Sequence, residues 1–170
     1  MRIATFGKFN VPHSGHKALL HSMSTNYANI TEIIVGFSSS NKNNRYVISR
    51  ISDFRAVCGN NVTFSSCICP NLWTYCKMLN DEPTILCLGS DRIAQTQRLI
   101  NSAQFKNINL REINRTSNSA SSTKLRCLYK TARGNFEVFN ELALINAYCV
   151  SRLTAKIAYD AIKQELIDVK

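Results

Sequence analysis

The sequence predicts an α/β fold in which helices cover both faces of a parallel β-sheet. Short apolar runs of strand length alternate along the chain with amphipathic segments of helical period, which is typical of consecutive βαβ units. The strand-like runs, such as 33–37 and 84–88, are apolar at successive positions instead of alternate ones. Strands with this pattern are buried on both faces, so the sheet should lie inside the molecule.

Seven helices and five strands are expected. The expected strands are 2–6, 30–37, 62–66, 84–88 and 107–113. The expected helices are 15–23, 47–57, 72–79, 93–100, 121–132, 137–150 and 154–169. The chain is interpreted as one domain, residues 1–170, with a Rossmann-like, doubly wound five-stranded parallel sheet and a C-terminal helical extension from about 136 to 170. Ligands of such folds bind beyond the carboxyl ends of the strands.

Composition limits the classes of protein to consider. The 170 residues are 45% hydrophobic and 19% charged, which suits a domain with its own core and not a disordered chain. The apolar runs are too short to cross a membrane, and no signal peptide is evident, so a cytoplasmic protein is expected. Lys and Arg number 21 against 11 Asp and Glu, a net charge of +10. This excess requires anionic partners: phosphate ligands, an acidic surface or nucleic acid. Nucleic acid is the less favoured partner, because no zinc or helix-turn-helix pattern appears.

The seven cysteines predict neither a disulfide framework nor a metal site. Their number is odd, the closest pair is Cys67 and Cys69, and only three histidines are present. Structural zinc sites use paired Cys or His ligands at short spacings, whereas this chain has no Cys-x-x-Cys pair and few histidines to complete a site. We therefore expect reduced thiols, several of them buried as small apolar side chains.

The segment Gly7-Lys8-Phe9-Asn10-Val11-Pro12-His13-Ser14-Gly15-His16 joins the first strand to the first helix. Two of the three histidines stand at the start of that helix, where backbone N–H groups and the helix dipole favour an anion. Gly15 would let a phosphate approach the backbone closely. The alternative is that His13 caps a turn and His16 is a surface residue of the helix.

Two further segments follow later strands. In Leu88-Gly89-Ser90-Asp91-Arg92, Asp91 is expected to cap the next helix or to accept a hydrogen bond from a ribose, and Arg92 adds a cation. In Ser121-Ser122-Thr123-Lys124-Leu125-Arg126, hydroxyls at a helix start precede two cations. Positive charge there is unfavourable unless an anion binds. Solvated cations after an ordinary cap are the alternative.

Together the three segments resemble the signatures of the HxGH nucleotidyltransferase superfamily, which contains adenylyl- and cytidylyltransferases. The first is similar to Gly-x-Phe-x-Pro-x-His-x-Gly-His, the second to a Gly-Ser-Asp segment and the third to Ile-Ser-x-Thr-x-x-Arg. The resemblance covers most of the chain. It is greatest to small phage-encoded, cytidylyltransferase-like members, and looser to archaeal-type nicotinamide-mononucleotide adenylyltransferases through 33–44 and Trp73.

The resemblance implies transfer of a nucleoside monophosphate from ATP or CTP to a small acceptor phosphate, with release of pyrophosphate. AMP is preferred to CMP, because the third segment is closer to that of ATP-using members. His13, His16, Lys8 and Arg126 would be catalytic. The remaining expected nucleotide contacts are Gly7, Phe9, Asn10, Gly15, Gly89, Asp91, Ser121, Ser122, Thr123 and Lys124. Mg²⁺ would be held by substrate oxygens, without a metal site of the protein's own.

Some features depart from these signatures. Val11 precedes Pro12, so the proline stands one position later than usual, and Arg115-Thr116 lies one residue too far from the third segment for a close match to CTP-using members. A second class therefore stays open: a catalytically weak or inactive nucleotide-binding module of a phage assembly, in the host cytoplasm or the virion. Arg45, Arg50 and Arg55 would be solvated or reach the acceptor phosphate. Trp73 would pack or stack on the acceptor, and a homo-oligomer is left open.

Overall fold

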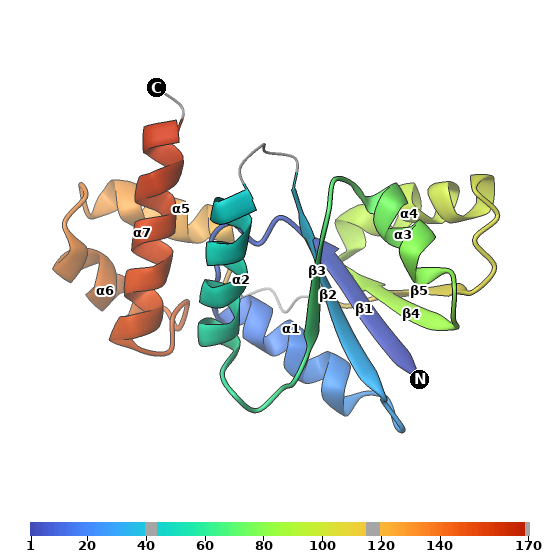
Figure 1. The fold of residues 1–170 in the computed structure, drawn as a ribbon. Coiled ribbons are helices and arrows are strands. Elements are labelled where there is room, and N and C mark those ends of the chain that lie inside the picture. The colour runs from blue at the N-terminus through green and yellow to red at the C-terminus, as the bar shows by residue number, and fades with distance from the viewer. Residues whose placement is uncertain (40–43, 115–119, 169–170) are drawn as a thin grey trace.

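A five-stranded, all-parallel sheet forms the centre of the computed structural model (Figure 1). The structure describes residues 1–39, 44–114 and 120–168, and of 44–47 the backbone alone. The strands are β1 (Arg2–Gly7), β2 (Glu32–Ser38), β3 (Ser65–Cys69), β4 (Thr84–Leu88) and β5 (Ile108–Glu112). Their order in the sheet is β3-β2-β1-β4-β5. The strand order reverses between β1 and β4, which is the place where such sheets bind ligands. The predicted fold class is confirmed.

Helices cover both faces of the sheet and enclose a separate core on each. The four helices are α1 (Ser14–Thr25), α2 (Asn44–Cys58), α3 (Leu72–Leu79) and α4 (Ser90–Ser102). The first core packs α1 and α2 on one face, with Phe37 and Phe54 fully buried. The second packs α3 and α4 on the other, around Tyr75 and Leu86. Tyr75 also donates its hydroxyl to Ile34 O at 3.0 Å, so the buried polar group is satisfied.

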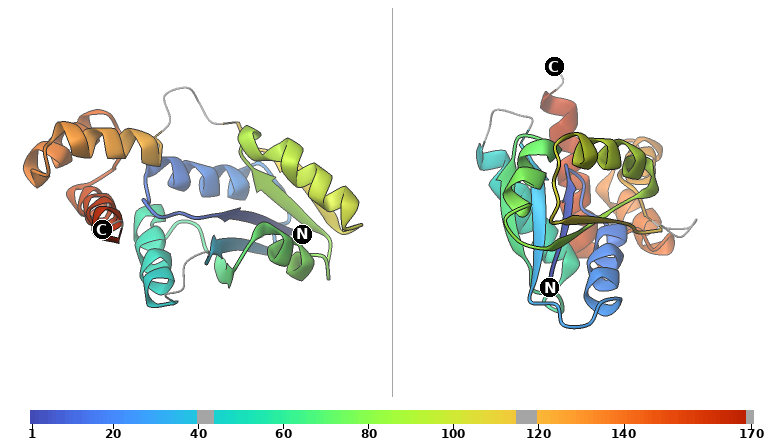
Figure 2. Two further views of the ribbon diagram at one scale, coloured as in Figure 1. Left: turned by 90° about the horizontal axis from the view of Figure 1, so that it is seen from above. Right: turned by 90° about the vertical axis from the view of Figure 1, so that its right-hand side faces the viewer.

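Three helices form the C-terminal extension: α5 (Ser122–Thr131), α6 (Phe136–Ile145) and α7 (Arg152–Asp168). They lie beside α2, at the opposite end of the molecule from α3 and α4 (Figures 1 and 2). Leu125, Phe139 and Tyr159 belong to the third core that they enclose. Val11 from the β1–α1 loop is also part of this core, so the extension packs on the loop that sequence analysis singled out.

Several predicted boundaries differ from the structure; the helix expected at 93–100, for example, is Ser90–Ser102. Two of the differences have a clear physical reason. The strand expected at 62–66 is Ser65–Cys69, because the residues that pair with β2 begin at Ser65 and Pro70 follows the last of them. Phe64 is buried in the first core without being part of the strand. The helix expected at 137–150 ends at Ile145, since Asn146 caps it and Ala147 takes a left-handed φ of 56°.

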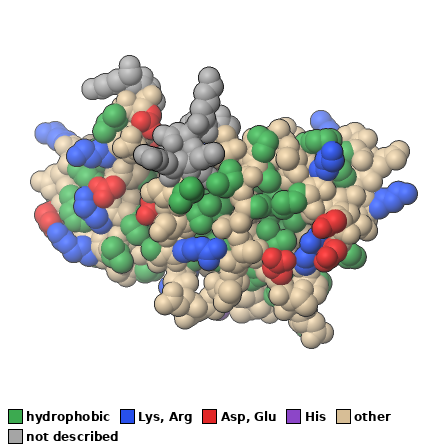
Figure 3. Space-filling model, viewed as in Figure 1, with side chains coloured by type: hydrophobic (Ala, Val, Ile, Leu, Met, Phe, Trp, Pro, Cys, Tyr) green, Lys and Arg blue, Asp and Glu red, His purple; other side chains and the backbone are tan. Residues whose placement is uncertain are grey.

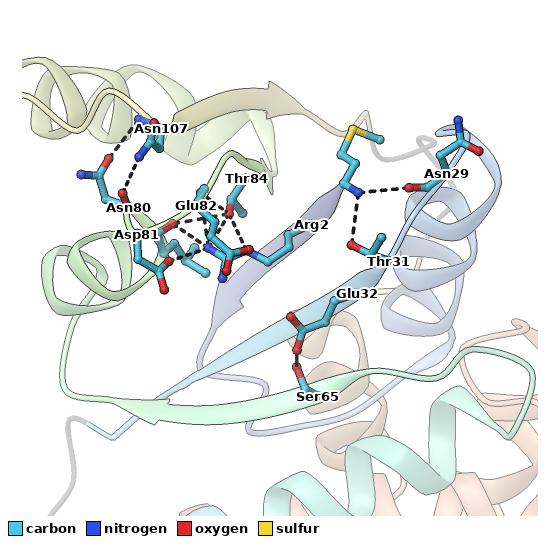
Figure 4. Close-up of polar contacts among 12 residues, drawn as sticks. Arg2, Asn29, Thr31, Glu32, Ser65, Asn80, Asp81, Glu82, Thr84 and Asn107 are labelled. Atoms are coloured by element: carbon cyan, nitrogen blue, oxygen red, sulfur yellow. Dashed lines mark hydrogen bonds and ion pairs between the residues drawn. The ribbon is translucent and has the colours of Figure 1, made fainter.

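The amino ends of the strands are tied together by polar contacts (Figure 4). The Arg2 guanidinium donates to Asp81 Oδ1 at 2.7 Å, to Thr84 Oγ1 at 3.0 Å and to Leu79 O at 2.9 Å. These bonds fasten β1 to the turn between α3 and β4. The terminal ammonium of Met1 donates to Asn29 O at 3.1 Å. This edge of the sheet is therefore occupied by internal contacts.

The cysteines and the surface complete the fold. All seven cysteines are free thiols, as expected. Burial raises the pKa of Cys58 and Cys67 to about 12, and that of Cys87 to about 11, so these thiols stay neutral.

None of the described helices has the length and apolar character needed to cross a bilayer. On the face drawn in Figure 3, basic side chains are spread out, and several lie beside acidic ones.

Candidate functional site

A cavity of about 350 Å³ opens at the carboxyl ends of β1 and β4. Most of the residues that the sequence predicts for the site line it. Those from the first segment are Gly7, Lys8, Phe9, Asn10, His13, Gly15 and His16. Those from the other two segments are Gly89, Asp91, Arg92, Ser122 and Arg126. The structure thus brings together three segments that are far apart in the sequence.

Three predicted residues do not line the cavity, all of them on or next to the first turn of α5. Ser121 is the N-cap of α5, and its hydroxyl accepts from Lys124 N at 3.2 Å. The Thr123 side chain is exposed. Lys124 Nζ lies 5.6 Å from the centre of the Tyr148 ring, in cation–π distance. In this structure Ser121 caps α5, and none of the three residues contacts the cavity.

His13 and His16 form a stacked pair at the start of α1. Their ring centres are 3.8 Å apart with an angle of 21° between the planes. Both are buried, with only 3% and 7% of their surface exposed. His13 is the N-cap of α1 and accepts from Gly15 N through Nδ1 at 3.1 Å, which leaves Nε2 as the ring nitrogen not used in the cap. The alternative that His16 is a surface residue of the helix is wrong. The other part of that alternative, a capping role for His13, is what the structure has.

Phe9 gives the loop its shape. It takes a left-handed backbone with φ of 49°, and its ring packs edge-on against His16 at 5.1 Å between centres. The ring also folds back over Gly7, where a Cβ would lie 2.9 Å from its tip. Glycine at position 7 is therefore needed for Phe9 to reach His16.

The amino ends of α1 and α5 meet at Gly15. A Cβ on Gly15 would lie 2.7 Å from Ala120 O, the carbonyl next to the N-cap of α5. Ser122 Oγ donates to Val11 O at 3.3 Å across the same junction. Neither helix has an acidic residue in its first turn. Two positive helix ends are thus directed toward one region.

The turn between α6 and α7 holds the start of α1 from the other side. Ser14 N donates to Tyr148 O at 3.0 Å, and Ser14 Oγ donates to Ala147 O at 2.7 Å. The left-handed backbone of Ala147 turns the chain at this point. The C-terminal extension therefore helps to place the two histidines.

Residues at the start of α4 line the cavity without the predicted cap. The N-cap of α4 is Gly89, which makes no side-chain capping bond, and Asp91 lies within the first turn. The expectation that Asp91 is the N-cap is wrong, because the helix begins at Ser90, two residues earlier than a cap at Asp91 would require. Arg92 donates to Phe6 O at 3.2 Å, which anchors this cation at the end of β1.

Arg50 was expected either to be solvated or to reach the acceptor phosphate; the solvated reading is wrong, and contact with an acceptor stays a prediction. Only 5% of it is exposed, and its guanidinium donates to Lys8 O, Asn10 Oδ1 and Ser38 O. It thereby fixes the β1–α1 loop against the end of β2. Arg55 lies over the Phe64 ring at 4.3 Å. The side chain of Arg45 and the pair Arg115-Thr116 lie outside the described residues.

Sequence reasoning missed one wall of the cavity. Ala18, Leu19 and Ser22 line it from α1. With Gly15 they stand at positions i, i+3, i+4 and i+7, so the helical period could have identified them as one face. Ile113 and Asn114, which follow β5, also line the cavity. Only their position after a strand end could have indicated this.

Trp73 lines a neighbouring hollow of about 390 Å³ between α3 and α4. The tryptophan is 47% exposed, and its ring lies 6.3 Å from that of Phe105. Arg92 lines both this hollow and the main cavity. Lys77 Nζ lies over the Trp73 ring, 5.3 Å from its centre. The contact with Phe105 agrees with the packing role, and stacking on an acceptor stays a prediction.

The residues that the structure describes include no group of three or more His, Cys, Asp or Glu that could hold a metal ion. Compared with known proteins, the chain matches no family model and no curated protein sequence. Fold and site together define an α/β protein of Rossmann-like fold with a histidine-containing cavity at the strand-order reversal.

Proposed function

We propose that this protein is a nucleotidyltransferase. It would transfer a nucleoside monophosphate, AMP in preference to CMP, from a nucleoside triphosphate to a small acceptor phosphate, with release of pyrophosphate. The observation that carries the proposal is the convergence of the amino ends of α1 and α5 on the cavity that holds His13 and His16. Helix ends without acidic residues, together with nearby cations, form a site suited to a polyphosphate.

The chemistry asks for positioning and charge stabilisation. An oxygen of the acceptor phosphate attacks the α-phosphorus and forms a new P–O bond. The bond between the α-phosphorus and the oxygen bridging to the β-phosphate breaks, and its electron pair leaves with pyrophosphate. The acceptor phosphate is already ionised at neutral pH, so the step needs no general base. Rate enhancement then comes from aligning the two phosphates and neutralising charge in the transition state.

The proposed roles follow the positions of the cavity residues. His13 and His16 stabilise charge on the α-phosphate, with Lys8 beside them. Ser122 and Arg126 bind the β- and γ-phosphates, and Gly89 and Asp91 lie where the nucleoside would be held. Asp91 is the one carboxylate among the described residues that line the cavity. Mg²⁺ would therefore be carried by phosphate oxygens and water, which suits its coordination in phosphate-bearing substrates.

The test is pyrophosphate release from ATP and CTP with a panel of acceptors: nicotinamide mononucleotide, pantetheine phosphate, flavin mononucleotide and glycerol phosphate. His16→Asn should abolish release, because it removes the imidazole from the α-phosphate. His21→Asn is the matched control, since His21 is the exposed histidine of the same helix. His21→Asn should unfold at a temperature close to that of the unmodified protein. His16→Asn should still fold, with a lower melting temperature because the Phe9 ring loses a packing partner.

Two results would count against the proposal. Turnover of His16→Asn near that of the unmodified protein would remove the histidine pair from the reaction. Nucleotide binding without pyrophosphate release for any acceptor would favour the binding module of a phage assembly instead.

A further inference from the structure

Glu165 on α7 forms an ion pair with Arg126, one of the residues that line the cavity. Arg126 Nε lies 2.8 Å from Glu165 Oε2, and Arg126 Nη2 lies 2.9 Å from Glu165 Oε1. Two parallel contacts of this kind fix the plane of a guanidinium as well as its position. The two side chains are 40% and 22% exposed, so the pair is partly shielded from water.

Glu165 occupies a position that does not favour its own helix. It lies in the last turn of α7, where the helix carries partial negative charge, and that turn contains no basic residue. A carboxylate at a helix carboxyl end is repelled by the dipole. The stability of α7 therefore gives no reason for an acid at this position, whereas the contact with Arg126 does.

We infer that Glu165 is a positioning residue for the polyphosphate part of the site, acting through Arg126; the inference rests on the proposed function. An arginine side chain that moves freely in solvent loses rotamer freedom when it binds a phosphate. Arg126 is already held in a fixed orientation at the cavity, so less entropy is lost on binding. The C-terminal helix thus contributes to affinity for the triphosphate without touching it.

Binding of inorganic tripolyphosphate with Mg²⁺, measured by calorimetry, tests this without an acceptor or turnover. Glu165→Gln keeps the shape of the side chain but removes its charge, and should weaken binding by about three- to tenfold. The KM for ATP should rise by a similar factor while kcat stays within about twofold, because the β- and γ-phosphates are held in the ground state and the transition state alike. Glu165→Asp, which keeps the charge, should restore part of the affinity.

Glu137→Gln is the matched control. Glu137 forms a similar two-point ion pair with Arg152, at 2.5 and 2.7 Å, and neither residue lines the cavity. Its loss should leave tripolyphosphate affinity unchanged. Thermal unfolding of the same samples separates lost affinity from lost folding.

The variant Arg126→Ala tests the role that the proposed function gives to Arg126, independently of the role inferred for Glu165. If Arg126→Ala leaves tripolyphosphate affinity unchanged, the proposed role of Arg126 fails, and the role of Glu165 fails with it. If Arg126→Ala weakens binding but Glu165→Gln has no effect or tightens it, only the inference is overturned. In the double variant, binding no weaker than in Arg126→Ala supports an action through Arg126, and additive losses contradict it.

Discussion

Gly15 on α1 and the carbonyl oxygen of Ala120 before α5 are so close that no side chain fits between them, since a Cβ on Gly15 would lie 2.7 Å from Ala120 O and 2.9 Å from the His13 ring. The two helices can place their positive ends at one cavity only because residue 15 is glycine. This contact gives Gly15 a role in packing as well as in any approach of a phosphate.

Gly15→Ala should therefore separate α1 from α5. We expect a loss of about 1–3 kcal/mol in the free energy of unfolding, as for other overpacked sites, and strongly weakened nucleotide binding. Thermal unfolding and ATP titration measure the two effects. Gly59→Ala is the control: it meets no atom within 4 Å but has a φ of 75°, so it should lose stability without losing binding. Normal ATP affinity in Gly15→Ala would contradict this account of the junction.

Val11→Ala tests the contact between the loop and the C-terminal extension. Val11 is fully buried in the third core, so removing two methyl groups should cost about 1–3 kcal/mol, measured by urea unfolding. Val138→Ala, at a position 42% exposed on α6, should cost less than about 0.5 kcal/mol. Equal costs for the two substitutions would show that Val11 is not part of the core.

Arg50→Lys should destabilise the β1–α1 loop. An ammonium group cannot reproduce the fork of donors that reaches Lys8 O and Ser38 O together, so buried acceptors lose their partners. The expected cost is about 2–4 kcal/mol in urea unfolding. Arg55→Lys provides the comparison, since Arg55 is exposed and lies over the Phe64 ring. A cost for Arg50→Lys no larger than for Arg55→Lys would contradict the role given to Arg50.

Asp53→Asn should stabilise the protein at neutral pH. Burial, and then repulsion from Asp160, raise the pKa of the Asp53 carboxyl in the folded state. The folded protein therefore binds a proton there more tightly than the unfolded chain. The ionised Asp53 carboxylate lowers the free energy of unfolding. This destabilisation is absent below the ordinary carboxyl pKa of about 4, and it grows as the pH rises from there through the raised pKa.

The increase in melting temperature for Asp53→Asn should accordingly be full at pH 7 and vanish in acid. Asp160→Asn should give a smaller gain, because it also breaks the ion pair of Lys156 Nζ with Asp160 Oδ1 at 2.6 Å. A gain for Asp53→Asn that is the same at pH 3 and pH 7 would exclude the charge of Asp53 as its cause.

The periodicity of the sequence was enough to predict the sheet and its helices, because strands buried on both faces leave continuous apolar runs. The helix Leu72–Leu79 and the strand Thr84–Leu88 have the predicted boundaries. The strand predicted after Gly59 begins too early, since Phe64 packs in the core without pairing with the neighbouring strand. The apolar character of a residue predicts that it is buried, but its pairing with a neighbouring strand is decided by tertiary structure.

The sequence predicted the segments that line the cavity, but not the contacts that hold those segments in place. The segments around His13, Gly89 and Ser122 carry local signals, and they meet at the strand-order reversal, as the fold class implies. The burial of Arg50 and the pairing of Arg126 with Glu165 depend on helices that are distant in sequence. Such contacts have no spacing of their own in the sequence, so no local pattern could have indicated them.

The loop between β1 and α1 passes from one hydrophobic core to another within two residues, with Phe9 in the first and Val11 in the third. Val11 shares its core with Leu125 and Phe139, and Ser14 donates to the turn between α6 and α7. A substitution that loosens the C-terminal helices should therefore also loosen the loop that carries the two histidines. The stability of the extension and the shape of the cavity are coupled through this loop.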